Sequence, residues 1–405
     1  MRRGANLRVL VLLAAACSRA PEGGQPSSPT GSSDVTTKPA VHPDRDDAAS
    51  PVVTAKPEPS APARREPSGP LPDRYLAFAG ACDAGEVVTV AAIGDVLLHH
   101  ELQKQAYASP ERFSVLWSGV ADLIAKADVS YANLEVPIAT GMTKDGEAED
   151  PGLRFDNAVY TGYPFFNAHP SLAEDLAKAG IDIVSTANNH ALDRGSLGID
   201  RSLAALDKVK LAHTGTRKKG TKDPWHAVTE VKGLEIGWVA CTLHTNFGKD
   251  DHDQVLHCFK QTKELLATVK AVAAEVDAVI VTPHWGKEYD PVPQEKQRTL
   301  AQQLVDAGAT AVLGAHPHVL QPWEKRTAAD GREAFVLYSL GNFAHHQRSL
   351  PRRSSIIAYL GLRKDGTGKA KVVGARYLPI HVRMEGDKEA FFVESIDRAG
   401  GPADA

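Results

Sequence analysis

Polar side chains that could bind a metal ion or take part in catalysis follow five predicted strands of this chain, at the point where each strand ends. They are Asp95 after 90–94; Asn133 and Glu135 around the end of 129–134; Asn188, Asn189 and His190 after 183–187; His284 after 279–283; and His316 and His318 after 311–315. Ligands of open α/β sheets bind beyond the carboxyl ends of the strands, so we expect one shared site at this edge. The alternative is that each polar residue serves only its own strand end, since a sequence such as Gly94-Asp95 is an ordinary strand-to-turn ending.

The donor set comprises two carboxylates, an asparagine amide and three or four imidazoles. Mixed nitrogen and oxygen ligands suit Mn, Zn or Fe, whereas oxygen-only sites for Ca or Mg would not need the histidines. We therefore expect one or two divalent metal ions. Such ions can generate hydroxide at neutral pH and clamp a transferring phosphoryl group.

The elements that would position these residues alternate between buried strands and helices. Apolar runs predict strands over 87–93, 129–134, 181–186, 278–282 and 311–313, and helical spacing appears over 114–127 and 294–307. Ser171 to Glu174 has the pattern of a capping box, Gly180 would end that helix, and Ser196 would open the next. The runs 334–339, 355–360 and 371–378 predict strands without intervening helices. The pattern indicates an α/β core with a more antiparallel finish.

The first residues are typical of a secretory signal peptide. Arg2, Arg3 and Arg8 precede a short apolar stretch over 9–16, which is too short to span a bilayer. The stretch ends at Cys17 and resembles a bacterial lipobox, although Ala14 stands where Leu is usual; ordinary cleavage after an Ala-x-Ala site is the alternative. We expect an exported protein, lipid-anchored through Cys17 on the periplasmic or extracellular side of the cell envelope.

A proline-rich segment separates this signal from the apolar part of the chain. Residues 18–74 hold twelve of the 26 prolines and no Phe, Trp or Tyr, so they predict a disordered tether, followed by one domain over 75–398. The net charge of the chain is -4, without a basic stripe, which argues against a nucleic-acid partner.

Three cysteines remain beyond Cys17. Export permits a disulfide among Cys82, Cys241 and Cys258. Cys241 ends a predicted strand and Cys258 lies in the following loop, so they are the preferred pair. Cys82 is the spare or the alternative partner, and three buried thiols are the remaining possibility.

Six segments in order resemble the motif series of the CapA-type poly-γ-glutamate capsule-synthesis family. They are Ala92-Ile93-Gly94-Asp95, Asn133-Leu134-Glu135-Val136-Pro137, 187–195 with Asn188-Asn189-His190, 284–289 with His284-Trp285-Gly286-Lys287-Glu288-Tyr289, 314–319 with His316-Pro317-His318, and Ser339-Leu340-Gly341-Asn342-Phe343. The resemblance covers about residues 86–380. It implies a fold similar to the calcineurin-like metallophosphoesterases, a layered α/β sandwich with mixed sheets around a two-metal site.

The resemblance also implies a role for each matching residue. The metal ligands would be Asp95, Glu135, Asn189, His284, His316 and His318, with Glu135 in the bridging position. His190 would protonate a leaving group, and Asp193 would orient His190 or start the next helix. Two departures from the phosphoesterase pattern are Leu97 in place of a histidine, and Glu135 in place of a shorter Asp; they put a binuclear centre in doubt.

From these implications we expect the protein to be a metal-dependent hydrolase or transferase that acts on a cell-surface polymer or its phosphorylated precursor. The alternative is a non-catalytic component that binds a polymer or a partner within a capsule synthesis and export assembly. The expected partners are that polymer or its precursor, the membrane through the lipid anchor, and other capsule-synthesis membrane proteins.

Overall fold

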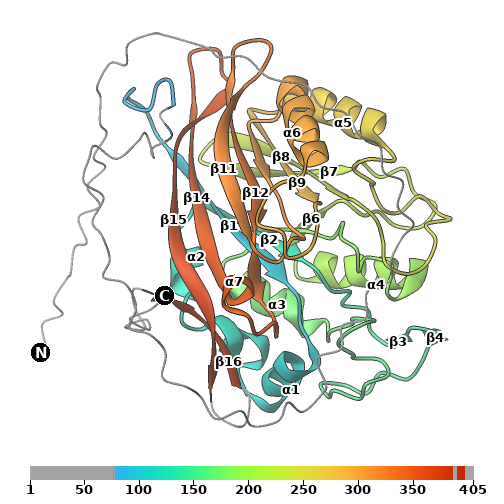
Figure 1. Ribbon diagram of the computed structural model, residues 1–405. Helices are drawn as coiled ribbons and strands as arrows, with labels where there is room; N and C mark the ends of the chain where they lie inside the picture. Colours follow the sequence, from blue (N-terminus) through green and yellow to red (C-terminus); the bar gives the residue numbers. More distant parts are fainter. Residues whose placement is uncertain (1–75, 77, 386–389, 397–405) are drawn as a thin grey trace, which may run out of the picture. The chain divides into compact units, whose positions relative to one another are not determined.

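Two mixed β-sheets lie face to face and share an apolar core in this computed structural model (Figure 1). The structure describes residues 76, 78–385 and 390–396; the predicted signal peptide and tether fall outside the described residues. The shared core joins Val90 and Tyr131 of one sheet to Trp238, Ile280 and others of the second. The rings of Tyr131 and Trp238 stack across the interface with their centroids 5.7 Å apart.

The first sheet combines a parallel half and an antiparallel half. Its strand order is β16-β15-β14-β1-β2-β5-β6, and β13 also pairs with β1. The bounds are β1 Val88–Val96, β2 Val129–Leu134, β5 Ile183–Ser185, β6 Ala212–Thr214, β13 Asn342–Ala344, β14 Ser354–Lys364, β15 Ala370–Glu385 and β16 Ala390–Ser395. Strands β1, β2, β5 and β6 are parallel, whereas β14, β15 and β16 form antiparallel pairs. The predicted antiparallel finish is therefore confirmed, but the prediction that no helix intervenes is wrong, because the short helix α7 (Leu350–Arg353) precedes β14.

The second sheet has a parallel centre and antiparallel edges, in the order β11-β12-β10-β9-β8-β7. The bounds are β7 His226–Val231, β8 Leu234–Thr242, β9 Ala278–His284, β10 Ala311–Leu313, β11 Leu320–Thr327 and β12 Glu333–Leu340. A separate short hairpin is formed by β3 Met142–Thr143 and β4 Gly146–Glu147.

Helices cover the outer face of each sheet and complete the sandwich. Their bounds are α1 His100–Ala108, η1 Arg112–Trp117 (3-10), α2 Ala121–Ile124, α3 Ser171–Lys178, α4 Gly195–Lys208, α5 Thr262–Glu275, α6 Glu295–Ala307 and α7 Leu350–Arg353. The helices from α1 to α4 bury apolar side chains against the first sheet, and α5 and α6 do so against the second. The predicted layered α/β sandwich with mixed sheets is confirmed.

Two helix predictions need correction. The segment 114–127 is not one helix, because η1 and α2 are separated around Gly119, where an added Cβ would lie 3.1 Å from the carbonyl oxygen of Val393. Helix α3 does begin at Ser171, but the capping box is absent: Pro170 occupies the N-cap position. The carboxylate of Glu174 accepts a hydrogen bond from Arg112 instead.

A disulfide joins Cys241 at the end of β8 to Cys258 in the following loop. The preferred pairing is therefore confirmed, and the alternatives in which Cys82 pairs with either residue are wrong. In the described part of the chain, the helices are too short or too polar for one of them to cross a membrane.

Candidate metal centre

Asp95 lies near the carboxyl end of β1, where the backbone packs closely against Gly341. Its amide donates a hydrogen bond of 3.0 Å to the carbonyl oxygen of Gly341. A Cβ on Gly94 would lie 1.8 Å from that same oxygen, so only glycine allows this approach. The Gly-Asp ending of β1 is therefore fitted to the neighbouring turn, which carries Asn342 into the same edge.

The loop after β10 holds two histidines in an uncommon backbone conformation. His316 has φ 97° and His318 has φ 57°, and Pro317 lies between them. Non-glycine residues rarely adopt positive φ, and such strain persists only where the surroundings enforce it, often at functional sites. The enforced loop directs both imidazoles inward, so that each is 3% exposed.

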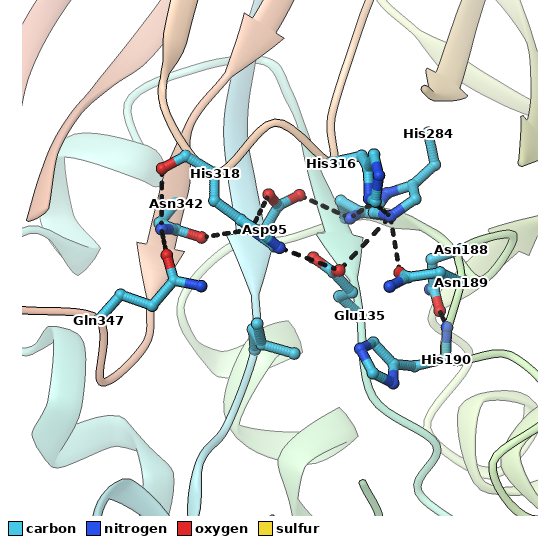
Figure 2. A network of polar contacts seen from close by, with 12 residues as sticks. Asp95, Glu135, Asn188, Asn189, His190, His284, His316, His318, Asn342 and Gln347 are labelled. Carbon is cyan, nitrogen blue, oxygen red and sulfur yellow. Dashed lines mark hydrogen bonds and ion pairs between the residues drawn. The ribbon is translucent and has the colours of Figure 1, made fainter. Parts of the chain in front are cut away.

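Six predicted ligands meet in one buried cluster (Figure 2). Nδ1 of His318 lies 3.1 Å from Oδ2 of Asp95. Nε2 of His284 lies 2.9 Å from Oδ1 of Asn189, 3.1 Å from Nδ1 of His316 and 3.4 Å from Oε1 of Glu135. The expectation that these strand-end residues converge therefore agrees with the geometry of the two sheets.

Glu135 is the predicted ligand whose surroundings best fit a bound cation. Its side chain is fully buried, and within the described part of the chain neither carboxylate oxygen accepts a hydrogen bond. A buried carboxylate without compensation is costly, and a cation bound by it would supply the missing partner. Glu135 also belongs to two overlapping groups of close donor atoms, one with His316 and His318 and one with Asp95 and His284. The donor set thus fits divalent metal ions, with Glu135 shared between the groups.

Burial and mutual repulsion set the protonation of the cluster. Burial raises the pKa of Glu135 well above its usual value, and the nearby charges of Asp95 and Glu288 raise it further. Burial likewise lowers the pKa of His284 and of His316, each helped by the neighbouring imidazoles. Neutral imidazole is the form that binds a metal, so these two histidines are suited to ligation at neutral pH.

His318 differs from the other two histidines because it contacts a carboxylate. Burial disfavours its charged form, but the hydrogen bond and the charge of Asp95 outweigh burial and raise the pKa of His318. A bound cation would compete with this proton for Asp95 and His318, since a metal ion is the largest local charge in such a site.

His190 and Asp193 form a dyad at the edge of the cluster. Nδ1 of His190 lies 2.8 Å from Oδ2 of Asp193, and that oxygen also accepts a hydrogen bond of 2.7 Å from the amide of Phe166. The N-cap of helix α4 is Arg194 and not Asp193, so the helix-start alternative for Asp193 is wrong, while its carboxylate contacts His190. In the view of Figure 2 the imidazole of His190 appears below Glu135, and no dashed line joins it to the predicted ligands.

Two asparagines in the cluster were not among the predicted ligands. The amide of Asn133 contacts Oδ1 of Asp95 at 2.8 Å and Nδ1 of His284 at 3.2 Å. Oδ1 of Asn342 lies 2.9 Å from Nδ1 of His318. Both follow or end a strand within the quoted motif segments, so the strand-end signal that identified the other residues applied to them too.

Leu97 lies near the cluster where the phosphoesterase pattern has a histidine. It is 3% exposed and belongs to the apolar core under the first sheet. An apolar side chain cannot ligate a cation, so the donors on this side are those of Asp95, Glu135 and the histidines of the second sheet.

Comparisons with known proteins identify the family of this chain. Residues 89–347 match the model of the family described as bacterial capsule synthesis protein PGA_cap. The capsule biosynthesis protein CapA of Bacillus anthracis is 26% identical over 296 residues, covering 71% of this chain and 67% of that protein. The PGA biosynthesis protein CapA of Bacillus subtilis (strain 168) is 25% identical over 293 residues, covering 71% of each.

Two solved structures are similar at lower identity. A putative 5'-nucleotidase from Staphylococcus aureus in complex with alpha-ketoglutarate is 13% identical, with a TM-score of 0.45, covering 73% of this chain and 54% of that one. A hypothetical protein from Thermus thermophilus is 17% identical, with a TM-score of 0.42, covering 72% and 99%. The family match spans more than half of the chain and includes every predicted ligand, and the chain therefore belongs to the bacterial capsule synthesis protein PGA_cap family.

Proposed function

We propose that this protein is a metal-dependent hydrolase or transferase of capsule biosynthesis, acting on a cell-surface polymer or its phosphorylated precursor. The observation that carries the proposal is Glu135, whose two buried oxygens accept no hydrogen bond within the described residues while donors from both sheets surround them. A divalent cation bound by these oxygens would supply the partner that they lack.

The predicted ligands would hold one or two divalent cations, with Glu135 between the two donor groups. When bound, such cations act as Lewis acids and lower the pKa of water. Asn189 would contribute an amide oxygen and fix the position of His284 through their contact of 2.9 Å.

His190 would provide the proton that a leaving group needs. Asp193 holds Nδ1 of His190, which leaves Nε2 as the nitrogen that can exchange a proton with substrate. Phe166 contacts the imidazole edge-to-face, with ring centroids 4.6 Å apart, and its amide binds Asp193. The ring is thus held from two sides before substrate arrives, as general acid catalysis requires.

The test is metal analysis of the protein purified without a histidine tag, followed by a screen of phosphoester and γ-glutamyl substrates. Bound Mn, Zn or Fe together with turnover would support the proposal. Metal without turnover on either class would favour the non-catalytic component of a capsule assembly. The absence of metal from protein refolded with each ion would contradict both the cofactor and the catalytic role.

We also propose that the protein is exported and anchored through lipidated Cys17, which would place the site outside the cytoplasm near the polymer and other capsule-synthesis membrane proteins. The basis is the signal sequence up to Cys17. Cys17→Ser should move the protein from the membrane fraction to the soluble fraction or block its processing. A membrane-bound, normally processed Cys17→Ser protein would contradict the anchor.

A further inference from the structure

Tyr289 lies next to the candidate metal centre, with its ring 5.9 Å from that of His318. In the segment 284–289, only His284 is a predicted ligand. The amide of Tyr289 donates a hydrogen bond of 2.7 Å to the carbonyl oxygen of Pro317, between the two histidines of the neighbouring loop. The rings of Tyr289 and His318 are inclined by 34°, and the φ of Tyr289 is 64°. A bulky residue with positive φ is held by its surroundings, so Tyr289 is a fixed part of this loop pair.

Arg352 stacks on that tyrosine. Its guanidinium carbon lies 3.5 Å from the centre of the Tyr289 ring. The centre of the Tyr289 ring in turn lies 5.9 Å from the centre of the His318 ring. The distance from the guanidinium carbon to the centre of the His318 ring therefore cannot exceed the sum of these two distances. A guanidinium over an aromatic face is attracted by the negative face of the ring, which holds the cation in place.

A second set of contacts ties Arg352 to the centre through the backbone. Its carbonyl oxygen accepts a hydrogen bond of 3.1 Å from Nδ2 of Asn342, whose Oδ1 contacts His318. Gln347 links the same partners, because its Oε1 accepts from Asn342 and its Nε2 donates to the hydroxyl of Tyr289 at 3.3 Å. Arg352 is therefore positioned from two sides relative to His318 (Figure 2 shows His318, Asn342 and Gln347).

The guanidinium of Arg352 has no anionic partner in the part of the chain that the structure describes. Other arginines of this chain are committed to carboxylates, among them Arg112 to Glu174 and Asp175, and Arg383 to Glu394. Stacking occupies the face of the guanidinium, while its five N–H donors lie in the plane and remain available. A planar fork of this kind matches the two oxygens of a carboxylate or a phosphate.

We propose that Arg352, held on Tyr289, binds an oxyanion of the substrate beside the metal centre and so determines specificity for anionic substrates. The oxyanion is a carboxylate or a phosphate, which share this recognition chemistry. The inference rests on the proposed function, because it assumes that substrate binds at the metal centre. It adds a residue from outside the metal-ligand and proton-donor set.

The experiment compares Arg352→Gln with Arg376→Gln as a matched control. Arg376 also lies over a tyrosine ring, that of Tyr359, but on the exposed surface of β15. Calorimetric titration of the metal-loaded proteins would use three probes: a γ-linked glutamate oligomer, the same oligomer with its carboxylates amidated, and phenyl phosphate. Metal content and thermal stability would be measured for each variant, and Arg352→Lys would keep the charge while removing the fork.

We expect Arg352→Gln to weaken binding of at least one anionic probe by about ten- to a hundred-fold, as the loss of charged hydrogen bonds implies. The affinity of Arg352→Lys should lie between those of Arg352→Gln and the unaltered protein. Arg376→Gln should bind like the unaltered protein. The probe that is affected identifies the oxyanion as carboxylate or phosphate. Where a substrate is turned over, KM should rise more than kcat falls.

Equal affinity of Arg352→Gln and Arg376→Gln for both anionic probes would overturn this inference, as would failure of the unaltered protein to bind either probe. Equal losses for the amidated oligomer would also overturn it, because they would show a role unrelated to charge. These outcomes are distinct from failure of the proposed function, which would appear as absent metal in the unaltered protein.

Discussion

Oδ1 of Asn342 lies 2.9 Å from Nδ1 of His318, and Nδ2 of the same amide donates a hydrogen bond of 3.1 Å to the carbonyl oxygen of His318. The side chain of Asn342 thus contacts both the ring and the backbone of His318, whose φ is positive. Residues that orient a metal-binding histidine from behind affect metal affinity nearly as much as ligands do.

Asn342→Ala should therefore lower metal affinity by about 10- to 100-fold, because the His318 ring loses its orientation and its loop loses an anchor. Competition with a fluorescent chelator would measure the change. Gln347→Ala removes a side chain that, among the described residues, contacts Asn342 and Tyr289 but none of the predicted ligands, so it should lower the metal affinity less than Asn342→Ala does. A metal affinity of Asn342→Ala equal to that of the unaltered protein would show that Asn342 does not support the site.

The strand ends were predictable from the sequence because their signals are local. The buried runs before Asp95 and His284 are continuous and apolar, as strands covered on both faces require, and each ends at a chemically distinctive residue. The ends of strands β1, β2, β9 and β10 were accordingly located to within a few residues.

The contacts between strand ends were not predictable in the same way. Asn133 and His284 are separated by 151 residues, and their contact depends on how two different sheets face each other. The alternation of strands and helices does not specify that β13 pairs with β1, which is what brings Asn342 beside Asp95. The orienting role of Asn342 therefore became visible only in the structure.

Local signals also failed where a tertiary contact competed with them. Glu174 could have completed a capping box with Ser171, but Arg112 binds its carboxylate at 2.9 Å. Similarly, Oγ of Ser171 lies 3.0 Å from Nδ1 of His169. Arg112 is 62 residues from Glu174, so a local pattern of residue types cannot show this partner, whereas His169 is only two residues before Ser171.

The His190–Asp193 dyad predicts a separation between metal binding and turnover. Asp193→Asn should lower kcat by roughly 100-fold on a substrate identified by the screen, because His190 loses the carboxylate that fixes its tautomer and supports its charged form. His190→Ala should do the same. Metal content, measured by mass spectrometry of the purified variants, should stay unchanged. A parallel loss of metal in both variants would mean that the dyad supports the centre structurally.

The Cys241–Cys258 disulfide should stabilise the fold and the loop that it closes. The two residues are 17 positions apart. Because a cross-link of that span restricts the unfolded chain, it raises the free energy of unfolding by about 3 kcal/mol. The Cys241→Ser/Cys258→Ser variant should lose about that much free energy of unfolding in urea titrations. His244 lies in the closed loop with its ring 5.9 Å from that of His316, so metal affinity should fall as well. Unchanged stability in the double variant would contradict this role.

His99 should make the protein sensitive to mild acid. Burial lowers the pKa of His99 from 6.5 to about 3; its Nδ1 lies 3.1 Å from the carbonyl oxygen of Leu97, and its ring meets Phe166 edge-on with centroids 5.2 Å apart. The folded protein therefore keeps this imidazole neutral, whereas the unfolded chain binds a proton below pH 6.5. The stability attributable to a neutral His99 is full above pH 6.5 and decreases as the pH falls from there toward 3.

The variant His99→Gln cannot bind that proton and should flatten the acid side of the stability profile. Between pH 6.5 and about pH 5, we expect the unaltered protein to lose about 1.5 kcal/mol more free energy of unfolding than His99→Gln, since one pKa unit corresponds to about 1.4 kcal/mol and the unfolded imidazole is already half protonated at pH 6.5. Urea titrations in the presence of EDTA would measure this without interference from metal release. His252, which is exposed, provides the control His252→Gln, whose profile should follow that of the unaltered protein. If the His99→Gln profile ran parallel to the unaltered one across this range, His99 would not be the group that the acid sensitivity depends on.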